Sequence, residues 1–416
     1  MVKKALIILL VGIVISYFIP TKSKDFFKAY NVNDTASKTL KEFQARSTKT
    51  IEVDGVNWEY FSGGKGAKTI LFIHGMGGAY DLWWQQINDF EYEYKVISFS
   101  LPEDINSLNS ASNGIIKILE TEKITKFYVV GTSMGGYIAQ YLLKIIPDRI
   151  EKIVLGNTFP PNDLILEKNK EKSRIIPFLP EIVISKLGNK QLFEKILPAG
   201  NNDKLLTAFL PSLPFSKKQF VNRYAVIVDK FIAKPSKYLV KRIPKLILES
   251  ANDPLVAQEL REDLKNLYSD AKVFNFNNAG HFPYINEAKS YNFQLKQFFD
   301  SDNNFVEVEK TIQNYFKGRA VADIDLLGET FSKNAKLYTV INGKERVISL
   351  FDYFNKVKKE GEKTVRTRIL SGDITKTIAN YKTEFKYPSK TYQDYLTLLR
   401  TNGKWKIITK TFTKTN

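Results

Sequence analysis

The sequence predicts an α/β protein with a mostly parallel sheet, an inserted segment of different pattern and a second, smaller α+β domain. Three observations support this fold class. Short apolar strand patterns alternate with helical spacing from residue 45 to residue 300, as in a parallel sheet covered by helices. The alternation stops over residues 159–240, a stretch that holds eight prolines. A polar linker near residue 301 then precedes helices followed by alternating strands.

The composition narrows the possible chemistry. A chain of 416 residues exceeds one ordinary core, so two domains are expected. Because the chain has no cysteine and only two histidines, it lacks disulfides and a thiol nucleophile, and we expect no metal site. The net charge of +18 lies mainly in residues 159–240 and 303–416. This positive charge is suited to binding an anionic lipid surface. A lysine-rich proteome would produce the same charge without any such function. Nucleic acid is not an expected partner.

The N-terminus carries an uncharged run from Ala5 to Ile19 behind two lysines. A helix of that length covers about 22 Å, which is short for a bilayer core of about 30 Å and suits a signal sequence. Bulky residues occupy the end of the run, where a cleavage site needs small ones. We therefore predict that residues 1–20 form an uncleaved signal anchor and that the body is extracytoplasmic. Cleavage to a secreted or periplasmic protein is the alternative, and residues 21–44 are expected to be a polar spacer.

The first domain is expected to begin near residue 45 with a hairpin. Strand patterns at 51–53 and 58–61 flank Asp54-Gly55, a strong turn signal. A further strand pattern at 68–73 leads into His74-Gly75-Met76-Gly77. Glycines in such a loop let the backbone approach a substrate closely.

The most informative motif is Gly131-Thr132-Ser133-Met134-Gly135, a G-x-S-x-G pattern. Residues 126–130 resemble a buried strand, and residues 138–143 have helical apolar spacing. Strand, tight turn and helix are the context of a nucleophile elbow, in which Gly131 and Gly135 permit the turn and the serine points outward. Ser133 is therefore the candidate nucleophile, with an ordinary glycine-rich turn as the alternative.

A serine nucleophile needs a base, and the base needs a group that orients it. His281 is the candidate base because it follows a strand pattern at 272–276. Asp253 is the candidate orienting acid, since it follows the strand pattern at 245–249 and precedes His281 in the order that the elbow context requires. Asp163, which comes a few residues after an earlier strand, is the alternative acid.

The tetrahedral intermediate of acyl transfer also needs two N–H donors directed at its oxyanion. The Met134 amide follows the nucleophile, and the Met76 amide lies in the loop after strand 68–73. These two amides are the candidate donors. We expect His74 to support its turn, together with Gly75, rather than to act in catalysis.

Residues 45–300 resemble the α/β-hydrolase superfamily. The resemblance rests on four features in this order: the His74-Gly75 turn, the Ser133 elbow, Asp253 and His281. The resemblance implies Ser133 as nucleophile, His281 as base, Asp253 as orienter and the Met76 and Met134 amides as the oxyanion hole. Residues 159–240 resemble the helical cap that covers the nucleophile in many members. The loop sequence His-Gly-Met-Gly is more similar to the lipase, thioesterase and C–C hydrolase branches than to His-Gly-Gly-Gly carboxylesterases.

Residues 305–416 show a different pattern. An amphipathic helix at 306–316 and a second helix around 324–327 precede strand patterns at 336–340, 364–370, 374–385, 392–400 and 405–413. This order resembles the cone-shaped nuclear-transport-factor-two-like fold, in its SnoaL and lumazine-binding-like branch. Members that are enzymes hold an acid–base pair inside the cone. This region has no histidine and offers Asp323, Asp325, Tyr338 and Tyr353, so dimerisation or the binding of a small apolar ligand is the expected role.

The sequence thus predicts a serine hydrolase that cleaves carboxylic esters, including lipid-like acyl esters near the membrane, without cofactor or metal. Two alternatives stay open: a non-catalytic ligand-binding or signalling protein on a hydrolase fold, and a cofactor-free C–C hydrolase or perhydrolase with the same triad. The expected partners are a small-molecule or lipid ester, the membrane through the N-terminal segment, and a second copy through the C-terminal domain.

Overall fold

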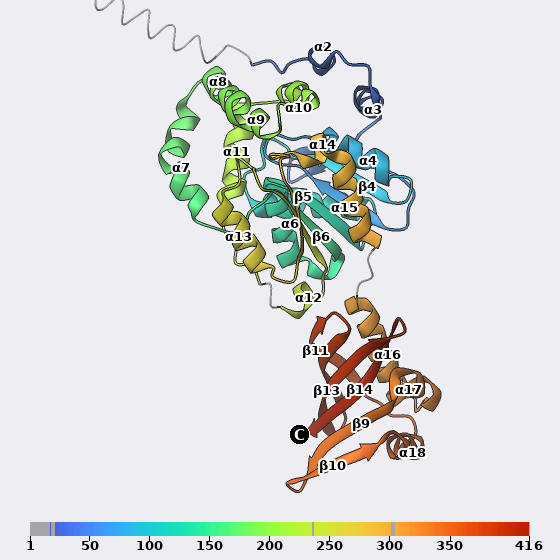
Figure 1. Ribbon diagram of the computed structural model, residues 1–416. Helices are drawn as coiled ribbons and strands as arrows, with labels where there is room; N and C mark the ends of the chain where they lie inside the picture. Colours follow the sequence, from blue (N-terminus) through green and yellow to red (C-terminus); the bar gives the residue numbers. More distant parts are fainter. Residues whose placement is uncertain (1–16, 18–20, 235–236, 301–303, 416) are drawn as a thin grey trace, which may run out of the picture. The chain divides into compact units, whose positions relative to one another are not determined.

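The computed structural model describes residues 17, 21–234, 237–300 and 304–415. The chain divides into two compact units after Asp300, and each is described by itself (Figure 1). Apart from Tyr17, the predicted signal anchor lies outside the described residues. Within those residues, no helix combines the length and the apolar character that a membrane crossing requires.

The first unit is built on a sheet of eight strands in the order β1-β2-β4-β3-β5-β6-β7-β8. All neighbours from β4 to β8 pair in parallel, and only β1 and β2 run antiparallel to their neighbours. The predicted mostly parallel sheet is therefore confirmed. The strands are β1 Lys49–Val53, β2 Val56–Gly63, β3 Thr69–Ile73, β4 Lys95–Ser100, β5 Phe127–Thr132, β6 Ile150–Gly156, β7 Lys245–Ser250 and β8 Lys272–Phe276.

Helices cover both faces of this sheet (Figure 1). One apolar core joins the sheet to α5, α6 and α13, and the other joins it to α4, α14 and α15. Strands such as β3 and β5 are buried along their whole length, and most of their residues are apolar. These helices are α4 Trp84–Phe90, α5 Leu108–Thr121, α6 Met134–Ile145, α13 Gln258–Leu267, α14 Pro283–Asn286 and α15 Ala288–Asp300.

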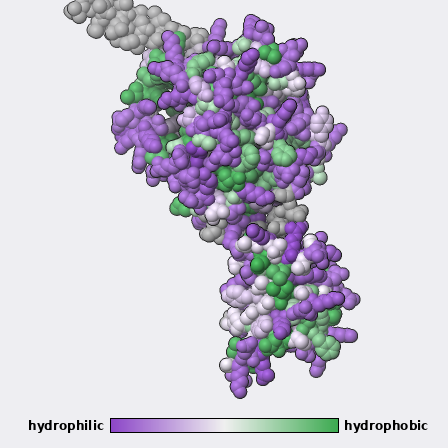
Figure 2. All heavy atoms as spheres, viewed as in Figure 1, coloured by the Kyte–Doolittle hydropathy of each residue, from purple (hydrophilic) through white to green (hydrophobic). Residues whose placement is uncertain are grey.

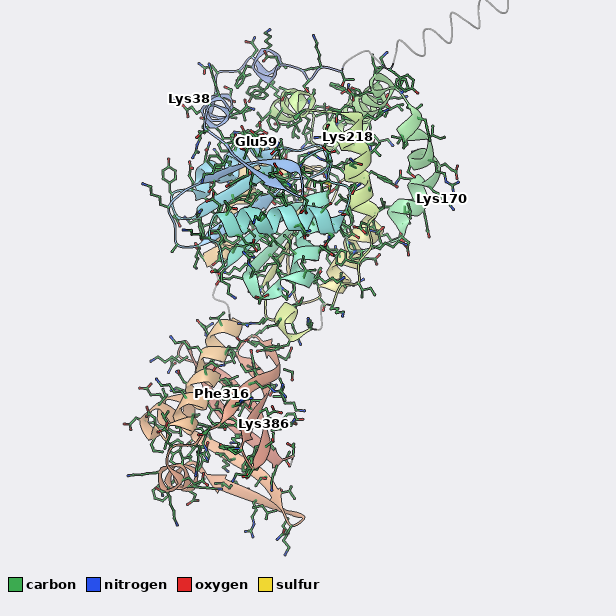
Figure 3. All side chains as sticks on the ribbon, turned by 180° about the vertical axis from the view of Figure 1, so that it is seen from behind. Lys38, Glu59, Lys170, Lys218, Phe316 and Lys386 are labelled. Carbon is green, nitrogen blue, oxygen red and sulfur yellow. The ribbon has the colours of Figure 1, made fainter. Side chains whose placement is uncertain are left out.

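A helical cap is inserted between β6 and β7, where the strand–helix alternation of the sequence stops. Its helices are α7 Leu164–Ile175, α8 Glu181–Gln191, α9 Leu197–Ala199, α10 Lys204–Phe209, α11 Lys217–Val228 and α12 Tyr238–Lys241. Hydrophilic residues cover most of the face of this unit seen in Figure 2, and Lys170 points outward from α7 in Figure 3. Most lysines of the cap are exposed to solvent.

Residues 21–44 do not form the polar spacer that the sequence predicts. Two short helices, α2 Phe26–Tyr30 and α3 Thr35–Gln44, pack against the first unit. Asp25 and Asp34 cap these helices with their side chains. Phe26, Leu40 and Phe43 are buried in the same core as α4. The three apolar residues are too widely spaced among lysines to stand out in the sequence.

The second unit has a six-stranded sheet in the order β10-β9-β14-β13-β12-β11, antiparallel except for the β9–β14 pair. Phe316 on α16, seen in Figure 3, is buried. The α+β class is confirmed, although β10 and α18 were not predicted. The elements are α16 Asn304–Ala320, α17 Ile324–Thr330, β9 Phe331–Ile341, β10 Lys344–Ser349, α18 Leu350–Glu360, β11 Arg366–Thr375, β12 Ile378–Tyr387, β13 Lys390–Thr401 and β14 Lys404–Lys414.

Candidate active site

Ser133 occupies the sharp turn between β5 and α6. Its backbone has φ 53° and ψ −123°, a conformation that is costly for a residue with a side chain. Both glycines of the motif are sterically required. A Cβ on Gly131 would lie 2.3 Å from the Gly135 carbonyl oxygen, and a Cβ on Gly135 would lie 2.2 Å from the Ile73 carbonyl oxygen. The motif thus places the serine at the carboxyl edge of the sheet in a strained, outward position.

The structure brings Asp253 and His281 together. They follow β7 and β8, which are neighbouring parallel strands, so their loops leave the same edge of the sheet. The His281 Nδ1 atom lies 2.8 Å from Oδ2 and 3.0 Å from Oδ1 of Asp253. An Nδ1 that donates to the carboxylate leaves Nε2 as the nitrogen that accepts a proton. Both residues are buried.

Asp253 is held as a carboxylate. Burial alone would raise its pKa, but the pairing with His281 and hydrogen bonds from Asn157 and the Leu255 amide outweigh burial and lower the pKa of Asp253. The Leu255 amide donates over 2.8 Å and the Asn157 Nδ2 over 2.8 Å. An acid with this many donors can orient a histidine without taking its proton.

Asn157 is a site residue that the sequence analysis missed. It directly follows β6 and has a left-handed φ of 40°. Its Nδ2 also donates to the Gly280 carbonyl over 3.3 Å, so it connects the Asp253 loop with the loop before His281. The only available signal was its position at the carboxyl end of a strand neighbouring β7.

His74 supports the loop that follows β3. Its Nδ1 donates to the Gly75 carbonyl over 2.7 Å, and its Nε2 accepts from the Leu101 amide over 2.9 Å. Burial, reinforced by the positive charge of Arg223, lowers the pKa of His74 to about 3. A neutral imidazole with both nitrogens engaged braces the backbone. Gly75 contributes space, because a Cβ there would lie 3.2 Å from Cβ of Ser133.

Arg223, on cap helix α11, also binds this loop and was not predicted. Its guanidinium donates to the carbonyls of Met76 over 2.6 Å, Gly78 over 2.9 Å and Leu101 over 2.7 Å. The side chain is almost fully buried, and burial lowers the pKa of Arg223 to about 9. It therefore stays charged at neutral pH while it fixes the carbonyls on either side of Gly77.

The Met76 amide lies in the loop after β3, and the Met134 amide lies at the start of α6, directly after Ser133. Within the described part of the chain, neither amide donates a hydrogen bond to another protein atom. They are therefore available to an oxyanion. The alternative acid, Asp163, lies elsewhere: it precedes α7, is mostly exposed and pairs with Lys230.

Several residues of this site line a cavity of about 360 Å³. Ser133, His281 and Met76 form one side of it. Cap residues, most of them apolar, form the opposite side: Ser185, Leu192, Ile196, Leu213, Phe215 and Phe220. Such a lining favours a substrate with a hydrocarbon part.

Residues 21–24, called here the N-terminal strap, form a further wall of the cavity through Thr21, Lys22 and Ser23. Three hydrogen bonds fix the strap to the cap. The Thr21 hydroxyl donates to Glu181 over 2.6 Å, the Ser23 hydroxyl to the Leu213 carbonyl over 2.9 Å and the Lys24 amide to the Pro211 carbonyl over 2.9 Å. The strap directly follows the predicted signal anchor in the sequence.

The second unit has its own small cavity, of about 90 Å³. Of the four candidates from the sequence, only Tyr353 lines it; Asp323 instead caps α17. The polar centre of this cavity is a buried cluster that was not predicted: Tyr315, Asp394 and Lys410. Across all described residues, no cluster of histidine or carboxylate side chains suited to a metal ion is found.

Two family models match the chain. An alpha/beta hydrolase family model matches residues 70–291, and a model described as "Putative lumazine-binding" matches residues 303–413. The first covers more than half of the chain and contains every candidate catalytic residue. The second covers the C-terminal unit, as the resemblance in the sequence predicted.

Several known proteins are similar to parts of this chain. The dihydrolipoyllysine-residue acetyltransferase component of an acetoin cleaving system from Cupriavidus necator is 30% identical over 32% of this chain, and the match spans only 37% of that relative. Maspardin from Danio rerio is 23% identical over 55% of this chain and 72% of that protein. Esterase YbfF from Escherichia coli is 23% identical over 51% of this chain and 85% of that protein.

Among solved structures, a hydrolase from Pseudomonas aeruginosa superposes with a TM-score of 0.54 at 17% identity, covering 62% of this chain and all of that one. An enol-lactonase from Burkholderia xenovorans gives a TM-score of 0.52 at 15% identity, over 61% of this chain. At these identities the superpositions establish the fold of the first unit.

Proposed function

The chain belongs to the α/β hydrolase family, and from this premise we propose that it is a serine hydrolase that cleaves carboxylic esters. One observation carries the proposal: Ser133 on its elbow borders the same cavity as His281, and His281 pairs with the buried Asp253. A relative named as an esterase supports the reaction class. In this proposal Ser133 is the nucleophile, His281 the base and Asp253 the orienting acid.

The proposed reaction has two halves. Ser133 Oγ attacks the ester carbonyl while His281 Nε2 accepts its proton, and the tetrahedral intermediate then expels the alcohol, which takes that proton from His281. Water, deprotonated by His281, attacks the acyl-enzyme, and collapse of the second intermediate releases the carboxylic acid and restores Ser133. Asp253 stays ionised throughout and stabilises the imidazolium.

The oxyanion of each intermediate would be held by the Met76 and Met134 amides. The free amides and the fixed loop support this role, since a donor that is already oriented need not reorganise during the reaction. His74 and Arg223 act as positioning residues, because they touch the loop and not the reacting atoms.

We also propose a membrane-anchored protein with an extracytoplasmic body that acts on lipid-like esters. The uncharged run before residue 20, the strap that follows it and the apolar cavity wall support this location and substrate. Protease treatment of intact cells tests the topology: digestion of the body in intact cells is expected, and protection until the membrane is opened would contradict it.

A fluorophosphonate probe tests the chemistry. We expect the full chain to be labelled and Ser133→Ala to be unlabelled at an unchanged melting temperature. Ser112→Ala is a matched control, because Ser112 is a buried helix serine outside the cavity lining. A folded protein without label and without activity on p-nitrophenyl butyrate would overturn the hydrolase proposal in favour of a binding protein.

A further inference from the structure

The cap contains a second cavity, of about 570 Å³, next to the catalytic one. It lies among α7, α8 and α11. Gly188, Gln191, Phe215 and Phe220 line both cavities, so these four residues form the wall between them. The catalytic cavity therefore has a neighbouring cavity that shares these four lining residues.

The lining of the second cavity suits hydrocarbon. Ile176, Ile184 and Val221 contribute apolar surface, and Ile184 is only 4% exposed. The charged residues around it, such as Lys172 and Lys190, are exposed, so their ammonium groups reach solvent while their stems cover the cavity. Each methylene group of an acyl chain that moves from water into this lining makes binding more favourable.

We propose that the second cavity receives the distal part of a long acyl chain and that Gly188 sets the chain length the enzyme accepts. This inference rests on the proposed ester hydrolase function. It assigns the substrate class as long-chain acyl esters, with the carbonyl at Ser133 and the end of the chain beyond the Phe215–Phe220 pair, whose ring centroids are 6.2 Å apart.

Gly188 is suited to this role because it leaves open space. A Cβ built there meets no atom within 4 Å, although position 188 lies inside α8 and lines both cavities. A glycine inside a helix is less favourable than alanine, so a larger residue would stabilise α8. The absence of a side chain therefore serves the passage between the cavities rather than the helix.

The test measures kcat/KM for p-nitrophenyl acetate, butyrate, octanoate and laurate with the full chain. For the wild type we expect kcat/KM to rise towards octanoate and laurate. Gly188→Leu is expected to lower laurate hydrolysis about tenfold or more, with acetate and butyrate within about twofold, and Gly188→Ala is expected to be intermediate.

Gly328→Leu is the matched control. Gly328 is also an exposed helix glycine whose Cβ would meet no atom within 4 Å, but it lies on α17 of the second unit. It should change neither the chain-length profile nor kcat/KM.

The outcomes separate the two proposals. If Ser133 is not labelled and no ester is hydrolysed, the proposed function fails. If labelling and hydrolysis are normal but the wild-type profile is flat, or Gly188→Leu slows every ester equally, the acyl-chain assignment alone is wrong. A loss confined to esters with a long alcohol chain, measured with alkyl acetates, would likewise overturn it.

Discussion

The Arg223 guanidinium donates a hydrogen bond of 2.6 Å to the carbonyl of Met76, the residue whose amide is a proposed oxyanion donor. This contact joins cap helix α11 to the loop after β3 across 147 positions of sequence. The same guanidinium holds Gly78 and Leu101. The cap therefore fixes the loop that carries this proposed oxyanion donor, in addition to lining the cavity.

Replacing Arg223 tests this coupling. Arg223→Met should lower kcat on p-nitrophenyl butyrate by about tenfold to a hundredfold, because a displaced oxyanion donor loses transition-state contact while ground-state binding, and hence KM, changes little. Arg223→Lys should restore part of kcat. Arg149→Met is the control, since Arg149 also donates to a backbone carbonyl, that of Ile124, away from the site. Equal loss of kcat in both variants would indicate general destabilisation instead.

Asp253 and Asp163 can be separated directly. Asp253→Asn should reduce kcat by roughly ten-thousandfold, because an amide next to His281 Nδ1 favours the wrong tautomer of the base. Asp163→Asn should be near normal, since Asp163 is exposed and pairs with Lys230. Steady-state kinetics on one short ester suffices. Near-normal turnover of Asp253→Asn would remove Asp253 from the triad.

The sequence predicts those site residues whose role depends on local chain geometry. Ser133 could be identified because the strand, the two glycines and the helix are contiguous. Asp253 and His281 could be placed because each follows a strand. Arg223 and Asn157 could not be found in this way, since their roles depend on contacts with distant loops and neither stands in a recognisable motif.

The elements of the fold likewise differ in whether the sequence predicts them. Strands β3 and β5 of the first unit were predictable because both their faces are buried and most of their residues are apolar. In the second unit β10 was missed because five of its six residues are exposed. The packing of residues 21–44 against the first unit was missed because few, widely spaced apolar residues carry it. Elements with little burial leave little trace in the hydrophobic pattern.

Glu122 predicts a pH dependence of stability. It accepts hydrogen bonds from Lys49 and Lys95 over 2.7 and 2.8 Å, and from Tyr60 and Ser62. Burial raises its pKa, but these partners outweigh burial and lower the pKa of Glu122 from 4.5 to about 2. Because the folded-state pKa is depressed, the ionised group stabilises the protein above pH 4.5, and this contribution is lost as the pH falls towards 2.

Glu122→Gln should therefore lower the free energy of unfolding at pH 7, and the difference from wild type should shrink between pH 4.5 and 2. Urea unfolding at several pH values measures this difference in the free energy of unfolding. Glu171→Gln, at a carboxylate that is 80% exposed, should change little at any pH. A Glu122→Gln difference that is constant with pH would show that the hydrogen bonds do not depend on the charge.

The N-terminal strap predicts a kinetic effect without a change in chemistry. Thr21→Val with Ser23→Ala removes two hydrogen bonds to the cap and loosens one wall of the cavity. KM for p-nitrophenyl octanoate should rise by up to about tenfold, while the fluorophosphonate labelling rate stays near that of wild type. Thr39→Val, whose hydroxyl bonds within α3, is the control. An unchanged KM would mean that the strap does not contact the bound ester.

The buried cluster of the second unit predicts a large stability effect that leaves hydrolysis intact. Lys410 Nζ lies 3.0 Å from Asp394 Oδ2 and donates to the Tyr315 hydroxyl over 2.6 Å, and all three residues are buried. Lys410→Met should destabilise this unit by roughly 3–5 kcal/mol, because it leaves the Asp394 charge buried without its partner. Calorimetry of the full chain should show one transition shifting while p-nitrophenyl butyrate hydrolysis is unchanged.

Adding Asp394→Leu to Lys410→Met should recover much of that stability, because no charge is then left buried. Recovery should be incomplete, since the Tyr315 hydroxyl would lose both of its partners at a cost of about 1–3 kcal/mol. If Lys410→Met alone leaves calorimetry unchanged, Lys410 and Asp394 do not form a buried pair in solution. If instead the double variant is worse than the single one, the carboxylate stabilises this unit through Tyr315 rather than through Lys410.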